Sequence, residues 1–235
     1  MHEAACKEAS CQNIMSFCIA VDGPAGAGKS TIAKKVAGKM NLVYVDTGAM
    51  YRAMAYYLIT QHTDLDNPEA ISANCRKAQI RIAYENGEQI VLLNGENVNP
   101  YLRIEEVGKA ASVTSANGSV RVRLVELQQQ MAEHTDLIMD GRDIGTCVLP
   151  KAQLKIYLTA SSRVRALRRY NELTAKGEAC DLDVIEADII DRDYRDMNRE
   201  ISPLKQAEDA VLIDTSDMTI EEVVEYIISL AEARK

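Results

Sequence analysis

The residues with the clearest chemical meaning lie between positions 23 and 31, where two glycines precede a lysine and a hydroxyl side chain at the spacing G-x-x-x-x-G-K-[ST]. Glycines let a backbone fold around phosphate oxygens with its N–H groups pointing inward. A helix that begins at the end of the loop adds the positive end of its dipole. The pattern predicts a loop that binds the phosphates of a nucleoside triphosphate. Its residues are Gly23, Pro24, Ala25, Gly26, Ala27, Gly28, Lys29, Ser30 and Thr31.

Two side chains of this loop have individual roles. Lys29 can reach the β- and γ-phosphates, and the hydroxyl of Ser30 can bind Mg²⁺. An ordinary glycine-rich turn would not explain why a lysine and a hydroxyl stand at the start of a helix. Asp140 ends a later apolar stretch, and an aspartate at such a strand end is typical of Mg²⁺ binding in proteins with this loop. The alternative for Asp140 is a turn or a helix cap, and Asp22 is interpreted as structural.

Arginines gather in the second half of the chain, although its net charge is −8. Transfer of a phosphoryl group between two nucleotides brings two anions together, and arginine binds phosphate oxygens with a planar fork that stays charged. Arg192, Asp196 and Arg199 are spaced i, i+4, i+7, which predicts one helical face. The alternative is that these arginines form solvated pairs on exposed helices. The other clustered arginines are Arg142, Arg165, Arg168 and Arg169.

The elements that must position these residues follow an alternating pattern. Short apolar stretches at 17–21, 42–45, 137–139, 154–158 and 211–213 are separated by helical patterns, including one helix expected over 105–131. Five such strands predict an α/β fold with a parallel sheet covered on both faces. Residues 79–84 and 89–93 alternate instead, with Asn86-Gly87 between them, which predicts an antiparallel hairpin in an insertion over about 63–105.

Composition limits the remaining possibilities. A chain of 235 residues with 47% hydrophobic and 26% charged residues is expected to form one folded domain with an insertion. The acidic balance argues against nucleic acid as a partner, and no apolar window is long enough to span a membrane. The six cysteines form no CxxC pair, so we interpret them as reduced thiols in a cytoplasmic protein. Residues 1–15 carry no secretory pattern and are expected to be a disordered extension.

The sequence also resembles a known family, the bacterial cytidylate kinases, which are P-loop nucleoside-monophosphate kinases. The matching stretches are residues 22–31, 46–52, 120–129, 140–145, 165–169 and 191–199. The resemblance implies a P-loop kinase domain over 16–235. It implies a three-layer fold with a five-stranded parallel sheet, a small antiparallel NMP-binding insert over about 63–105 and a helical lid over about 165–200. It also implies a monomer that transfers the γ-phosphate of ATP to CMP or dCMP with Mg²⁺, in pyrimidine nucleotide metabolism.

The same resemblance implies individual roles. Thr47 and Tyr51 line the acceptor pocket, and Asp196 binds the ribose. Arg165 belongs to the lid over ATP, and Ser30 and Asp140 hold Mg²⁺. Residues that contact the cytosine are Ser112, Arg121 and Asp143. Residues that clamp the acceptor phosphate or the transferring group are Arg52, Arg142, Arg192 and Arg199, with Lys29 on the donor.

Three other functions remain to be weighed. An enzyme for UMP or AMP is disfavoured by the insertion and by Asp143, because a carboxylate accepts a hydrogen bond from an amino group and repels a carbonyl. A GTPase-like switch would need an N-K-x-D stretch, which the sequence lacks. A nucleic-acid-binding module is disfavoured by the acidic balance and by few aromatic residues.

Overall fold

The main sheet has five strands that all run parallel, in the order β2-β6-β1-β7-β8. The structure is a computed structural model that describes residues 16–85 and 88–235, so the expectation for residues 1–15 lies outside the described residues. The strands are β1 (Cys18–Asp22), β2 (Val43–Asp46), β6 (Leu137–Gly141), β7 (Leu154–Thr159) and β8 (Val211–Asp214). The predicted parallel α/β fold is confirmed.

Helices cover both faces of this sheet because alternate side chains of its central strands point to opposite sides. Ile19 and Val21 of β1 pack with α1 (Lys29–Met40) and α8 (Ile220–Glu232). Cys18 and Ala20 pack on the other face with α2 (Thr47–Thr60) and α5 (Gly118–Ala132). All five residues of β1 are buried, as the apolar run over 17–21 predicts for the first four. Among the described residues, no helix has both the length and the apolar character needed to cross a membrane.

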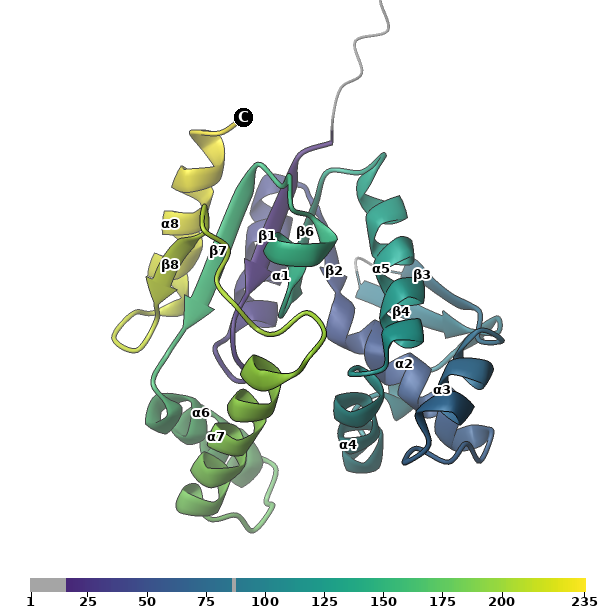
Figure 1. Cartoon of the computed structure of the whole chain (residues 1–235). Coiled ribbons are helices and arrows are strands. Elements are labelled where there is room, and N and C mark those ends of the chain that lie inside the picture. The colour runs from purple at the N-terminus through teal and green to yellow at the C-terminus, as the bar shows by residue number, and fades with distance from the viewer. Residues whose placement is uncertain (1–15, 86–87) are drawn as a thin grey trace, which may run out of the picture.

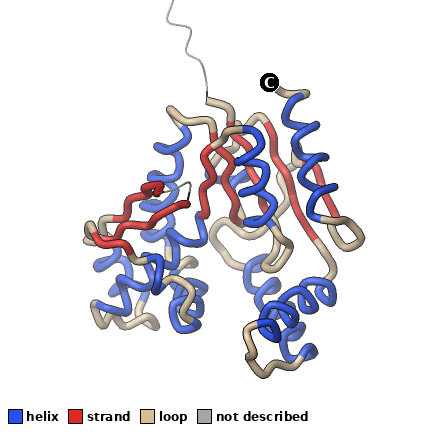
Figure 2. Tube along the Cα trace, turned by 180° about the vertical axis from the view of Figure 1, so that it is seen from behind, coloured by secondary structure: helices blue, strands red, loops and turns tan. Residues whose placement is uncertain are grey.

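The insertion forms a small antiparallel sheet beside the main one (Figure 2). It consists of β3 (Ile80–Glu85), β4 (Glu88–Leu93) and β5 (Glu96–Asn97), preceded by α3 (Pro68–Cys75) and followed by the short helix η1 (Asn99–Tyr101). β3 pairs with β4 up to Glu85 opposite Glu88, so the predicted hairpin is confirmed, while its Asn86-Gly87 turn lies outside the described residues. Gln89 of β4 accepts a hydrogen bond from the N–H of Asp46 at 2.8 Å, which attaches this sheet to the end of β2.

The single helix expected over 105–131 is wrong, because two helices occupy this stretch. They are α4 (Glu105–Thr114) and α5. The side chain of Asn117 accepts hydrogen bonds from the N–H groups of Ser119 and Val120 at 3.0 and 3.3 Å. An asparagine that caps a helix holds a non-helical backbone, so Asn117 ends the helical pattern and starts a new one.

At the carboxyl ends of the strands, α6 (Ser162–Ala175) and α7 (Leu182–Asn198) lie on one side and α2 and α4 on the other (Figure 1). The π-helical turn η2 (Ile144–Val148) follows β6 and joins the core on the face of the sheet that holds Cys18 and Ala20. The helical face predicted for Arg192, Asp196 and Arg199 holds only for the first two. Arg199 follows the last helical residue with an extended backbone, at φ −65° and ψ 143°.

Candidate active site

The glycine-rich loop connects β1 to α1, as the sequence predicts. Gly23 has a φ of 146°, and a Cβ at this position would overlap the carbonyl oxygen of Leu158. Gly28 has a φ of 87° directly before α1. Both positions therefore require glycine. Lys29, Ser30 and Thr31 form the first turn of α1, so the free N–H groups of this helix end face the loop, which suits an anion.

Lys29 is buried inside this loop. Its Nζ donates a hydrogen bond to the carbonyl oxygen of Pro24 at 2.7 Å. Burial lowers the pKa of Lys29 and the charge of Arg142 lowers it further, while Asp140 and Asp22 raise it. A phosphate would replace the carbonyl with a full negative charge and would favour the ammonium form of Lys29. The loop therefore suits an anionic ligand such as phosphate.

Asp140, at the end of β6, lies beside the first turn of α1. Its carboxylate accepts hydrogen bonds from the hydroxyl groups of Ser30 at 2.8 Å and Tyr44 at 3.0 Å. Burial raises the pKa of Asp140, and the charge of Asp46 raises it further. The hydroxyl of Ser30 and a buried carboxylate are hard oxygen ligands, and Mg²⁺ takes few such protein ligands beside phosphate and water. This pair therefore fits Mg²⁺.

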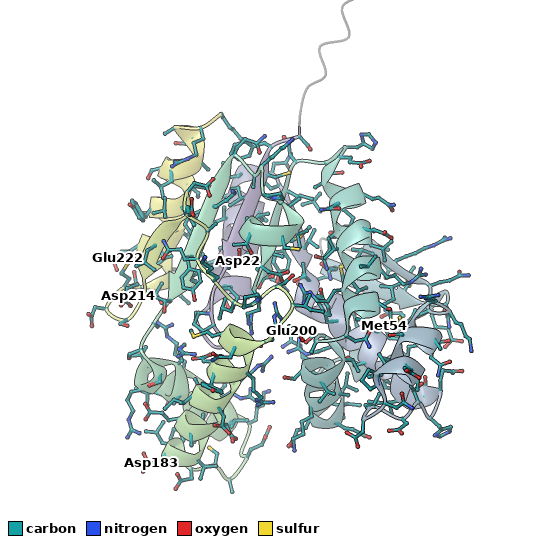
Figure 3. All side chains as sticks on the ribbon, in the orientation of Figure 1. Asp22, Met54, Asp183, Glu200, Asp214 and Glu222 are labelled. Atoms are coloured by element: carbon teal, nitrogen blue, oxygen red, sulfur yellow. The ribbon has the colours of Figure 1, made fainter. Side chains whose placement is uncertain are left out.

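Asp22 ties the loop to the segment after β6. Its carboxylate accepts hydrogen bonds from the N–H groups of Ile144 at 2.8 Å and Gly145 at 2.7 Å. Figure 3 shows Asp22 near the centre of the molecule. These bonds hold the backbone next to Asp143 in place. Asp22 therefore has a structural role, as expected from the sequence.

A buried group of charged side chains lies around Asp143. Arg121 of α5 donates to its carboxylate, and both residues are almost completely buried, at 3% and 4% exposure. Arg199 approaches the other carboxylate oxygen at 3.5 Å. The Arg121 guanidinium also lies 5.5 Å from the ring centre of Tyr51, whose buried hydroxyl has no hydrogen-bond partner among the described residues. Burial raises the pKa of Tyr51 to about 12.

Ser112 lies on α4, one helical turn before Ser115. The carbonyl oxygen of Ser115 accepts a hydrogen bond from Arg121 at 3.3 Å, and the hydroxyl of Ser115 donates to the carbonyl oxygen of Ser112 at 3.1 Å. The structure therefore brings Ser112 to the neighbourhood of Arg121. Thr47 lies nearby at the start of α2, where its hydroxyl donates to the carbonyl oxygen of Asp140 at 2.8 Å.

A second group of cations lies between Asp143 and the loop. Arg142 donates to Asp196 of α7 at 2.8 Å. Arg192 lies one helical turn before Asp196, and its Nε is buried without a partner among the described residues. Burial lowers the pKa of Arg192 and the charge of Arg142 lowers it further. Burial also lowers the pKa of Arg52, whose guanidinium lies beside Gly48 in the first turn of α2. Cations crowd here in a chain with a net negative charge, which suits an anionic ligand.

Arg165 is buried among protein groups. It is 5% exposed and donates to the carbonyl oxygens of Ala160 and Ala25, each at 2.9 Å. It also donates to Asp193 of α7 at 2.6 Å. Arg165, which itself belongs to α6, therefore joins the loop to α7.

The other two clustered arginines lie elsewhere. Arg168 donates to the carbonyl oxygen of Thr215 at 2.8 Å, and Arg169 pairs with Glu172 on the surface. The structure does not bring them to the site.

The residue types alone did not indicate two further neighbours of the site. Tyr44 holds Asp140, as described above, and no sequence signal marks it. Asp46 caps α2 by accepting from the N–H of Ala49 at 2.9 Å, and its charge raises the pKa of Arg52. An aspartate directly before a helix is a recognisable cap, so Asp46 could have been identified in that role.

A phosphate-binding loop between β1 and α1 of a parallel sheet, with a buried lysine and a surrounding group of arginines, defines the class of P-loop kinases. A family model described as "Cytidylate kinase" matches residues 19–233. This chain belongs to the cytidylate kinase family.

Individual relatives agree with this assignment. The chain is 50% identical to a cytidylate kinase of Listeria innocua serovar 6a, over 93% of this chain and 97% of the relative. It is 48% identical to a cytidylate kinase of Ligilactobacillus salivarius, over 92% and 96% respectively. A solved structure of an uncharacterized protein from Eubacterium ventriosum matches with a TM-score of 0.50 and 11% identity, covering 93% of this chain and 100% of that one. That last likeness concerns the fold alone.

Proposed function

We propose that this chain transfers the γ-phosphate of ATP to CMP or dCMP, giving ADP and CDP or dCDP. Membership of the cytidylate kinase family carries this conclusion. The structure supports it because a triphosphate-binding loop and a second group of buried arginines lie on the same edge of the sheet. An ATP-dependent kinase needs both, because its two substrates are anions.

The donor is bound by the loop of residues 23–31. Lys29 exchanges its bond with the carbonyl oxygen of Pro24 for the β- and γ-phosphates. Ser30 and Asp140 hold Mg²⁺, which supplies charge neutralisation on the phosphate oxygens. Arg165 holds the lid helices against the loop.

The acceptor is bound by the groups around Asp143. Asp143 accepts a hydrogen bond from the exocyclic amino group of cytosine, and Arg121 and Ser112 donate to the ring nitrogen and carbonyl oxygen. Thr47 and Tyr51 line this pocket, and Asp196 binds the ribose. The acceptor phosphate lies among Arg52, Arg142, Arg192 and Arg199.

The chemistry needs no general base, because the acceptor phosphate is already an anion that can attack. The arginines offset the repulsion between the two substrates and stabilise the charge on the transferring group. The groups in this account all belong to one chain, so the proposed reaction requires no second subunit. The net charge of −8 supports small anions rather than nucleic acid as partners, because only a local group of cations is required.

The test is an assay of ADP release with ATP, Mg²⁺ and one acceptor at a time, either CMP, dCMP, UMP or AMP, or no acceptor. We expect rapid turnover with CMP and dCMP, slower turnover with UMP and AMP, and little ADP without an acceptor. Omitting Mg²⁺ should abolish turnover. Preference for AMP or UMP over both cytidine nucleotides would refute the substrate, and ADP release independent of any acceptor would refute the kinase reaction.

A further inference from the structure

Arg103 lies between η1 and α4, and nothing described so far assigns it a role. The chain on its N-terminal side is firmly held. The ring of Tyr101 stacks on that of Tyr56 in α2, with ring centres 5.0 Å apart and planes inclined by 2°. Leu102 is 5% exposed and belongs to the core. Asn99 donates to the carbonyl oxygen of Gln89 and accepts from the N–H of Val91, at 2.8 and 2.9 Å. The backbone that leads into Arg103 is therefore held by these contacts.

The side chain of Arg103 carries an uncompensated charge. It is exposed, and no hydrogen bond or ion pair joins it to any other described residue. The acidic residue closest after it, Glu105, pairs instead with Lys109 one turn further along α4, at 2.7 Å. An exposed arginine without a partner is ordinary, so its neighbours decide what it can do.

Those neighbours are other cations. Tyr56, on which Tyr101 stacks, lies one helical turn after Arg52 on α2, so the loop that carries Arg103 runs along this part of the helix. The charge of Arg103 contributes to the lowered pKa of Arg52, after burial and against the charge of Asp46. Arg142 has the same effect on Arg52, and it also lowers the pKa of Lys29. The charges of Arg103 and Arg142 therefore both act on Arg52, and the charge of Arg142 also acts on Lys29.

We propose that Arg103 is a further binding residue for the phosphate group of the acceptor nucleotide, acting together with Arg52. This inference rests on the proposed function. Two guanidinium groups held close together repel each other, and a phosphate dianion between them converts this repulsion into two charge-assisted hydrogen bonds. The stack of Tyr101 on Tyr56 keeps Arg103 in place for this contact.

The test compares the wild type with Arg103→Gln, which keeps hydrogen-bonding capacity and removes the charge. We expect the KM for CMP to rise about tenfold or more, since a hydrogen bond to a charged group contributes about 1.5–3 kcal/mol. The KM for ATP should stay unchanged, and Arg103→Lys should recover part of the loss. Arg76→Gln is the matched control, because Arg76 is an exposed arginine directly after α3.

Calorimetric binding of CMP and of cytidine separates phosphate binding from a general effect on the pocket. Arg103→Gln should weaken CMP binding and leave cytidine binding as in the wild type. Equal weakening of both ligands, or an unchanged KM for CMP, would overturn the inference while leaving the proposed function intact. Failure of the wild type to phosphorylate CMP would instead refute the proposed function itself.

Discussion

Replacing Asp143 by asparagine should destabilise the fold more than replacing its partner Arg121 by glutamine. The side chains of Arg121 and Asp143 are 4% and 6% exposed, and Arg199 lies 3.5 Å from the same carboxylate. Asp143→Asn leaves two buried guanidiniums without a counter-charge, and removing one partner of a buried pair costs about 3–5 kcal/mol. Arg121→Gln leaves the carboxylate paired with Arg199, so we expect a cost of about 1–3 kcal/mol.

Urea unfolding of the wild type, both single variants and the double variant measures these costs. The double variant should lose less free energy of unfolding than the sum of the singles, by about 2 kcal/mol, because the two groups interact directly. Lys35 and Glu221 serve as the control pair. They are joined at 2.8 Å but are largely exposed, and their coupling should stay below about 1 kcal/mol. Additive costs at Asp143 and Arg121, or a larger cost for Arg121→Gln, would refute the reasoning.

The same Asp143→Asn variant tests recognition of the base. In the proposed complex, this substitution removes the charge-assisted hydrogen bond from the amino group of cytosine to Asp143 and introduces an amide that can donate to uracil. The ratio of kcat/KM for CMP to that for UMP should narrow by about 10- to 100-fold. An unchanged ratio would show that Asp143 supports the fold without reading the base.

Two further predictions concern the donor side. Lys29→Met should lower kcat by about 10²–10³-fold, as loss of one preorganised charge does, with little loss of stability, because burial of this ammonium is unfavourable. A turnover within about threefold of the wild type would contradict this role. Burial raises the pKa of Asp22 from 3.8 to about 6, so the folded protein holds this proton more tightly than the unfolded chain. The contribution of Asp22 to stability is therefore largest below pH 3.8 and falls by about 3 kcal/mol as the pH rises to 6. Urea unfolding of Asp22→Asn across this range should lack that fall, and parallel pH profiles of variant and wild type would contradict it.

Much of the fold could be predicted from the sequence because strong local signals mark it. Parallel strands buried on both faces need continuous apolar runs, and such runs mark β1, β6 and β7. The phosphate loop could be located because only glycine tolerates the backbone at Gly23 and Gly28. The hairpin of the small sheet followed from alternating side chains on either side of a turn dipeptide.

The predictions that failed depended on where a helix ends. Periodicity continues across Asn117 in the sequence, yet its side chain caps a new helix there. Arg199 keeps the spacing of α7 but lies beyond its end, where its extended backbone turns the guanidinium toward Asp143. Spacing describes a helical face only while the helix lasts, and the cap itself is a local contact that periodicity does not report.

The pairing of charged groups could not be predicted from the sequence for another reason. The resemblance to a family implied that Asp143 and Asp196 contact the nucleotide. It did not indicate that, without a nucleotide, Asp143 pairs with Arg121 and Asp196 pairs with Arg142. Such pairs depend on the distance between elements far apart in the chain. The bonds of Arg165 to Ala25 and Asp193 are of the same kind.

Those bonds of Arg165 have a thermodynamic consequence. Ala25 belongs to the loop that we propose binds ATP, whereas Asp193 lies next to Arg192, which we propose binds the acceptor phosphate. The guanidinium of Arg165 thus connects the two proposed substrate positions through its hydrogen bonds. Whatever factor ATP confers on the affinity for CMP, CMP must confer the same factor on the affinity for ATP.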